Sequence, residues 1–257
     1  MKLAFREFGQ GKPLIILHGL FGQSDNWNTI SKNFAEAGLH VFTLDQRNHG
    51  LSPQDDLWNY GAMAEDLKDF INEHRLERPI IMGHSMGGKT AMFFELKYPC
   101  VSSQLIVVDM APRAAVRHHE GVLKALNAVD FSKLANRKEA ESILDDYIQD
   151  FGTKQFLLKN IYWTENGNKK MDWRFNLKVI TDKYSEILVE VPHMMSLVET
   201  LVIRGQKSNY VSNDDLEDFK TRFPNLKVKT IAEAGHWVHA EKPKEFVEAA
   251  LGFIKIK

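Results

Sequence analysis

The chain has 257 residues, 44% of them hydrophobic, and a formal net charge of −1. An α/β fold of this length often forms one unit with a sizeable core, and the balanced charge does not indicate a nucleic-acid or membrane-surface partner. The single cysteine, Cys100, excludes an internal disulfide and fits a reducing compartment.

The chain carries no sign of a membrane or secretory segment. No apolar run approaches the roughly 20 residues that a membrane-spanning helix needs. The first residues include Arg6 and Glu7 and lack the apolar stretch of a secretory signal. We therefore expect no membrane span and a cytoplasmic location. The oligomeric state is not readable from the sequence.

Short apolar runs alternate with segments of helical period, which is typical of a mostly parallel sheet flanked by helices. An alternating segment at 3–8 predicts an antiparallel edge strand. Apolar runs predict buried strands at 13–17, 40–44, 78–82, 104–108, 201–203 and 226–231. Helical periods cover 63–74, 89–97 and 244–254. The sequence therefore predicts an α/β fold.

Residues 112–198 interrupt this alternation. They are rich in charged and aromatic side chains and have helix-like spacing, for example at 140–151. We expect a helical cap inserted between two strands of the sheet. Residues 1–111 and 199–257 would then form the core.

The strongest motif is Gly83-His84-Ser85-Met86-Gly87, a G-x-S-x-G pattern between a predicted strand and a predicted helix. A nucleophile on such a sharp turn has a strained backbone, and the flanking glycines leave room for the turn. The pattern predicts Ser85 as a nucleophile, with the amide of Met86 directed toward the same space.

The same residues also fit a second motif. Residues 83–90 spell G-x-x-x-x-G-K-T, the pattern of a phosphate-binding P-loop. The strand at 105–108, which ends at Asp109, is compatible with the magnesium-binding strand of such proteins. On this window alone, a nucleotide-binding protein remains an alternative.

Residues elsewhere in the chain favour the serine hydrolase. His18-Gly19 follows the first buried strand, where the next residues can supply a second oxyanion amide, from Leu20 or, in reserve, from Phe21. His236 follows the last predicted strand, where it can act as the base. A P-loop protein gives no reason for either feature.

The chain resembles the α/β-hydrolase superfamily in four segments that occur in the expected order: 18–22, 45–52, 83–89 and 234–243. Residues 47–50, 108–112 and 173–177 resemble small bacterial esterases with acyl-CoA thioesterase activity and their mitochondrial relatives. The resemblance implies an α/β-hydrolase fold, a helical cap over the pocket and no cofactor.

The acid of the catalytic triad needs a separate argument. The superfamily's usual Gly-x-x-Asp turn is replaced here by 205–208, which ends in Ser208, and a serine cannot hold the required charge. Asp214 and Asp215 start a predicted helix and fit helix N-terminal charges. Asp109 lies at a strand end on the catalytic sheet edge, although it could instead anchor the turn before Pro112.

The resemblance to this esterase subgroup implies that the acid is Asp109 and that a serine is expected at the position of Ser208. We therefore expect Asp109 to orient His236, with Ser208 bonded to the carboxylate or to the imidazole. Ser85, Asp109, His236 and Ser208 form the predicted catalytic group, with Leu20 and Met86 at the oxyanion hole. His118-His119-Glu120 is not expected to bind a metal, because adjacent side chains point apart.

The predicted reaction is hydrolysis of carboxylic esters or thioesters of small to medium acyl groups through an acyl-enzyme. Carbon–carbon bond hydrolases and perhydrolases use the same triad and remain alternatives. The natural substrate depends on the shape of the pocket, which the sequence does not display.

Overall fold

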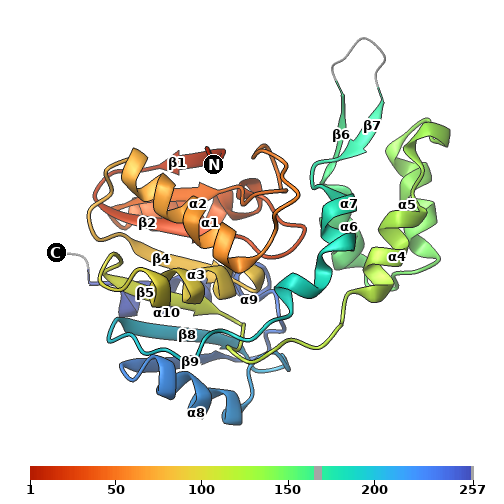
Figure 1. Ribbon diagram of the computed structural model, residues 1–257. Helices are drawn as coiled ribbons and strands as arrows, with labels where there is room; N and C mark the ends of the chain where they lie inside the picture. Colours follow the sequence, from red (N-terminus) through yellow and green to blue (C-terminus); the bar gives the residue numbers. More distant parts are fainter. Residues whose placement is uncertain (165–169, 256–257) are drawn as a thin grey trace.

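The computed structural model describes residues 1–164 and 170–255. Seven strands form one sheet in the order β1-β3-β2-β4-β5-β8-β9 (Figure 1). Strand β1 pairs antiparallel with β3, and all the other neighbours are parallel. The strands are β1 (Phe5–Phe8), β2 (Lys12–Leu17), β3 (Leu39–Leu44), β4 (Ile80–His84), β5 (Gln104–Val108), β8 (Glu199–Gly205) and β9 (Leu226–Ile231).

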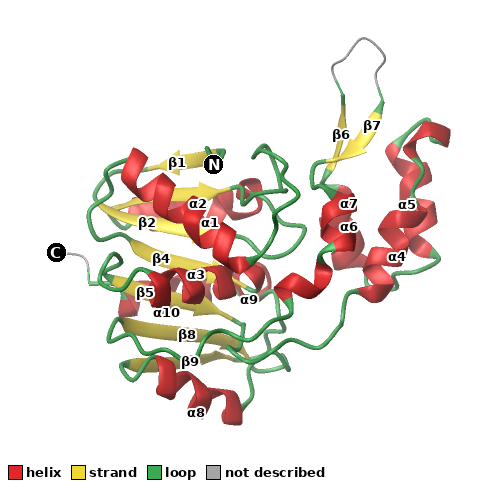
Figure 2. Ribbon diagram, in the orientation of Figure 1, coloured by secondary structure: helices red, strands yellow, loops and turns green. Residues whose placement is uncertain are grey.

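Helices cover both faces of the sheet (Figure 2). They are α1 (Asn28–Glu36), α2 (Tyr60–Glu73), α3 (Met86–Lys97), α8 (Asn213–Arg222), the short α9 (Val238–Glu241) and α10 (Pro243–Phe253). Side chains of β2 alternate between the two layers: Ile15 and Leu17 pack in the cluster that contains α2, α3 and α8. Leu14 and Ile16 pack with α1 and α10. The predicted mostly parallel sheet flanked by helices is therefore confirmed.

Residues 112–198 lie between β5 and β8 and form a group of elements beside the sheet, on the right of Figure 1. The elements are α4 (Glu120–Ala128), α5 (Arg137–Asp145), α6 (Phe151–Leu158), β6 (Ile161–Trp163), β7 (Met171–Trp173) and α7 (Leu177–Asp182). We call this segment the cap. Its buried residues share one apolar cluster with Leu20, Trp58 and Met86 of the sheet domain.

Two local features of the cap differ from the sequence prediction. The helix expected at 140–151 is two helices, because Asp150 caps a new one by accepting a hydrogen bond from the amide of Thr153 at 2.6 Å. The antiparallel pair β6–β7 was not predicted, since strands of three residues leave little alternation to detect.

The two passages that connect the cap to the sheet domain are joined to each other. The amide of Ala115 donates to the carbonyl of Leu188 at 2.7 Å, and that of Val191 donates to Pro112 at 2.8 Å. Lys89 of α3 is fully buried beneath them. Its Nζ donates to the carbonyls of Arg113 at 2.8 Å and Val189 at 2.6 Å, one in each passage.

Burial, together with the nearby charge of Arg113, lowers the pKa of Lys89 to about 8. In the unfolded chain the pKa of this lysine is near 10.5. Between pH 8 and 10.5 the lysine therefore loses its proton in the folded protein but keeps it in the unfolded chain. The unfolded state then binds more protons, so folding gains stability as pH rises across that interval. Below pH 8 both states are charged, and this contribution does not change with pH.

We expect Lys89→Met to lower the free energy of unfolding by about 2 kcal/mol at neutral pH, because two carbonyls lose their donor. The deficit should grow between pH 8 and 10.5, since only the wild-type protein gains stability there. Urea unfolding at a series of pH values measures both effects. Lys178→Met, at an exposed lysine of α7, is the matched control. A deficit that shrinks with rising pH would contradict the assignment.

In the residues that the structure describes, no helix is both long and apolar enough to cross a bilayer.

Candidate active site

Ser85 lies on a sharp turn between β4 and α3. Its backbone angles are φ 53° and ψ −119°, outside the ordinary regions for a residue with a side chain. The turn also requires its glycines: a Cβ on Gly83 would lie 2.1 Å from the carbonyl oxygen of Gly87. A Cβ on Gly87 would lie 2.3 Å from that of Leu17. Close packing of the turn against β2 therefore holds Ser85 in its strained position.

Asp109, His236 and Ser208 meet at the carboxyl end of the sheet. The Nδ1 atom of His236 lies 2.8 Å from Oδ2 of Asp109, and the hydroxyl of Ser208 donates to the same oxygen. The amide of Gly205 donates to the other oxygen, Oδ1, at 3.0 Å. Asp109 is fully buried, so these donors stabilise a charge that has no access to water.

His236 also packs beside the serine turn through its neighbour His84. The Nε2 atom of His84 lies 2.9 Å from the backbone carbonyl of His236, and the two rings are 4.7 Å apart. Burial lowers the pKa of His84 well below its usual value, so this ring is neutral and Nε2 is its donor. The loop that carries His236 is thus fixed against the residue that precedes Ser85.

The loop after β2 lies against the nucleophile from the other side. Gly19 to Gly22 form a turn in which the amide of Gly22 donates to Gly19 at 2.9 Å and Phe21 has a φ of 60°. A Cβ on Gly19 would lie 3.2 Å from that of Ser85. Within the described residues, the amides of Leu20, Phe21 and Met86 donate to no protein acceptor. The two predicted oxyanion donors, Leu20 of this turn and Met86 of the serine turn, therefore have amides without a protein acceptor among the described residues.

His18 and Gln46 hold this loop in place. The Nδ1 atom of His18 lies 2.8 Å from the carbonyl of Gly19, and its Nε2 accepts the amide proton of Gln46 at 3.0 Å. Since Nε2 accepts, Nδ1 carries the proton and the ring is neutral, in agreement with a pKa that burial lowers. The side chain of Gln46 donates to the carbonyl of His18 at 2.6 Å.

The phosphate-loop interpretation receives no support from the side chains that it needs. Lys89 is engaged with the two cap carbonyls. The hydroxyl of Thr90 donates to Oε1 of Gln46 at 2.9 Å and lies 3.1 Å from the carbonyl of Met86. Both side chains are buried among protein groups and do not face a space for phosphate.

A cavity of about 30 Å³ lies over Ser85. This space is small beside the roughly 300–1,000 Å³ of pockets that hold drug-sized ligands. Its wall combines Leu20 and Met86 of the oxyanion turns with cap-side residues, among them His119, Ile187 and Leu188. Residues of the cap therefore lie over Ser85.

His119, which the sequence analysis set aside, lines this cavity. Its Nδ1 lies 2.9 Å from the hydroxyl of Tyr184, and burial lowers its pKa to about 4, so the ring is neutral. Tyr60, Tyr184 and Tyr210 are further cavity residues that sequence reasoning missed. No motif could have identified them, because they come from separate segments that only the folded chain brings together.

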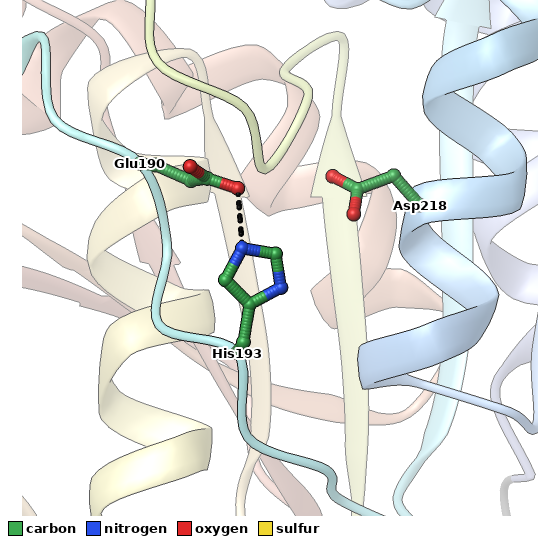
Figure 3. A group of neighbouring side chains, drawn as sticks. All are labelled: Glu190, His193 and Asp218. Carbon is green, nitrogen blue, oxygen red and sulfur yellow. Dashed lines mark ion pairs between the residues drawn. The ribbon is translucent and has the colours of Figure 1, made fainter.

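A group of possible metal ligands lies away from this site. Glu190, His193 and Asp218 bring ligand atoms within 4.8 Å of one another (Figure 3). The buried guanidinium of Arg222 already lies among them: it donates to Glu190 at 2.7 Å and to Asp218. It also lies 3.1 Å from Nε2 of His193, which is itself 2.9 Å from Glu190. Because Arg222 supplies the positive charge here, we assign no metal to this group.

Comparisons with known proteins agree with this architecture. A family model described as the alpha/beta hydrolase fold matches residues 12–243. Esterase YbfF of Escherichia coli K12 is 36% identical over 240 residues, which cover 92% of this chain and 91% of that protein. The sn-1-specific diacylglycerol lipase ABHD11 of Danio rerio is 34% identical over 256 residues, with coverage of 96% and 80%.

A solved structure described as a marine microorganism esterase superposes with a TM-score of 0.94. It is 40% identical, and the match covers 98% of this chain and 99% of that one. The strand-turn-helix elbow and the helix-covered parallel sheet define an α/β hydrolase, and the chain belongs to the alpha/beta hydrolase fold family. Within that family it is a serine hydrolase of the small bacterial esterase type.

Proposed function

We propose that the chain hydrolyses carboxylic esters of small acyl groups, with Ser85 as nucleophile, His236 as base and Asp109 as the acid that orients the base. One observation carries the proposal: the 2.8 Å contact between His236 Nδ1 and Asp109, on a loop that packs against the turn of Ser85. With Nδ1 held by Asp109, Nε2 is the nitrogen left to accept a proton from the serine.

The reaction follows from these positions. His236 takes the proton of Ser85 as the serine oxygen bonds to the acyl carbon. The amides of Leu20 and Met86 hold the negative charge that develops on the carbonyl oxygen. The adduct collapses, the bond to the leaving oxygen breaks, and His236 protonates that oxygen. A water molecule, activated by the same histidine, then releases the acid from Ser85.

Ser208 is assigned a supporting role. Its hydroxyl donates to the Asp109 oxygen that also receives His236, so it stabilises the carboxylate in its ionised form. Asp215, by contrast, belongs to a capping box at the start of α8 with Ser212 and pairs with Arg113 at 2.7 Å. Asp214 lies in the same first turn of that helix. Both carboxylates are therefore helix charges in this proposal.

Asp109→Asn should lower kcat by a factor on the order of 10³ to 10⁴, because an amide at this position favours the wrong imidazole tautomer. Ser208→Ala removes one hydrogen bond to a charged group and should cost about tenfold. Steady-state hydrolysis of p-nitrophenyl acetate measures both losses. Asp214→Asn is the control and should stay near the wild-type rate. Near-full activity of Asp109→Asn would show that another residue is the acid.

The size of the cavity sets an expectation for chain length. A cavity of about 30 Å³ favours a short acyl group, and each additional methylene that does not fit costs about tenfold or more. We expect kcat/KM to fall from p-nitrophenyl acetate to butyrate to octanoate. Acetyl-CoA assayed beside p-nitrophenyl acetate measures the preference between thioester and ester.

Two variants sharpen this test. Ser85→Ala should abolish turnover of every substrate. A variant with the wild-type rate would refute the assignment of Ser85 as nucleophile. Leu188→Ala shortens a side chain in the cavity wall and so enlarges the cavity. The ratio of kcat/KM values should then shift from p-nitrophenyl acetate toward p-nitrophenyl butyrate. A wild-type enzyme that prefers octanoate would contradict the size argument while leaving the nucleophile intact.

A further inference from the structure

Tyr210 lies directly on the face of the proposed base. Its ring and that of His236 are stacked with centroids 3.6 Å apart and planes 15° apart. The backbone of Tyr210 is fixed as well, because its amide donates to the hydroxyl of Ser208 at 3.2 Å. Tyr210 therefore contacts the base through its ring and the supporting serine through its backbone.

Three imidazoles beside His236 are uncharged near neutral pH. His84, His119 and His239 are its neighbouring imidazoles. Burial lowers the pKa of His84 well below its usual value, that of His119 to about 4 and that of His239 to about 3. Within the described residues, Asp109 is the charged group that bonds to the ring of His236.

A protonated imidazole in this place thus has two sources of stabilisation. Asp109 meets it at the ring edge through Nδ1. Tyr210 meets it at the ring face, where the negative π-face of an aromatic ring attracts a cation. Contacts on one face and at one edge also hold the imidazole of His236 in a single orientation. This orientation determines the direction of its second nitrogen, Nε2.

We propose that Tyr210 is a positioning residue for His236: its ring fixes the imidazole plane and stabilises the imidazolium formed when Ser85 gives up its proton. The proposal rests on the proposed roles of Ser85 and His236. It requires the aromatic face of Tyr210 and does not require the phenolic hydroxyl. An aromatic replacement should therefore keep most of the effect, and an aliphatic one should lose it.

Tyr210→Leu fills much of the same space without a π-face, and we expect kcat for p-nitrophenyl acetate to fall by about 3- to 30-fold. Tyr210→Phe should retain most of kcat. Tyr210→Met gives a second aliphatic variant in case the leucine protein does not fold, and thermal unfolding reports the folded state of each. Tyr147→Leu, at an exposed tyrosine of the cap, is the matched control. A phenylalanine variant as slow as the leucine variant would overturn the proposal.

Tyr210 also lines the cavity over Ser85, so an effect through substrate contact must be separated from one through His236. The loss caused by Tyr210→Leu should disappear in a His236→Ala background, where there is no imidazole to position. The residual p-nitrophenyl acetate rate and the rate of fluorophosphonate labelling of Ser85 measure this. An equal loss in both backgrounds would assign Tyr210 to substrate contact and refute the positioning role.

The two proposals fail in different ways. If His236→Ala alone retained wild-type activity, the proposed catalytic function would be wrong. If His236→Ala were inactive as expected and Tyr210→Leu matched the wild type, only the role of Tyr210 would be refuted.

Discussion

The site depends on one buried negative charge. Asp109 directly follows β5, has a φ of 48° and has no exposed surface. Within the residues that the structure describes, the side chain that pairs with it is His236, the proposed base. An ionised carboxylate in such a place needs donors to remain charged. It receives them from the amide of Gly205, the hydroxyl of Ser208 and the ring of His236. These groups join the loops after β5, β8 and β9, so the sheet edge is organised around this carboxylate.

The same arrangement explains why a serine can stand where related hydrolases have the acid. The loop after β8 carries Ser208 in place of a carboxylate, but it still contacts the carboxylate of Asp109. Ser208 donates to Asp109, and Tyr210 of the same loop stacks on His236. The loop is drawn close because Gly205 has no side chain; a Cβ there would lie 2.1 Å from the carbonyl of Gly235. The loop after β8 therefore contacts both Asp109 and His236, the proposed acid and base.

The cap adds a second constraint, which is closure over the nucleophile. Its two passages are bonded to each other and both are bonded to Lys89 beneath them. Further in, Asn160 of the cap donates to the carbonyl of Phe21 at 2.9 Å, so the cap also contacts the oxyanion turn. Cap residues share one apolar cluster with Leu20, Phe21 and Met86, and cap residues line one small cavity together with Ser85.

The sequence by itself determined the sheet strands, the serine turn and the place of His236, the proposed base, because each depends on local chemistry: buried apolar runs, glycines flanking Ser85, and a histidine after the last strand. The position of Asp109 required both a strand end and a family resemblance. Only the tertiary structure decided that Ser208 bonds to the carboxylate, that His119 lines the cavity and that Tyr210 covers His236. These are contacts between segments far apart in the chain. No local spacing encodes them, because they depend on how the loops converge at the sheet edge.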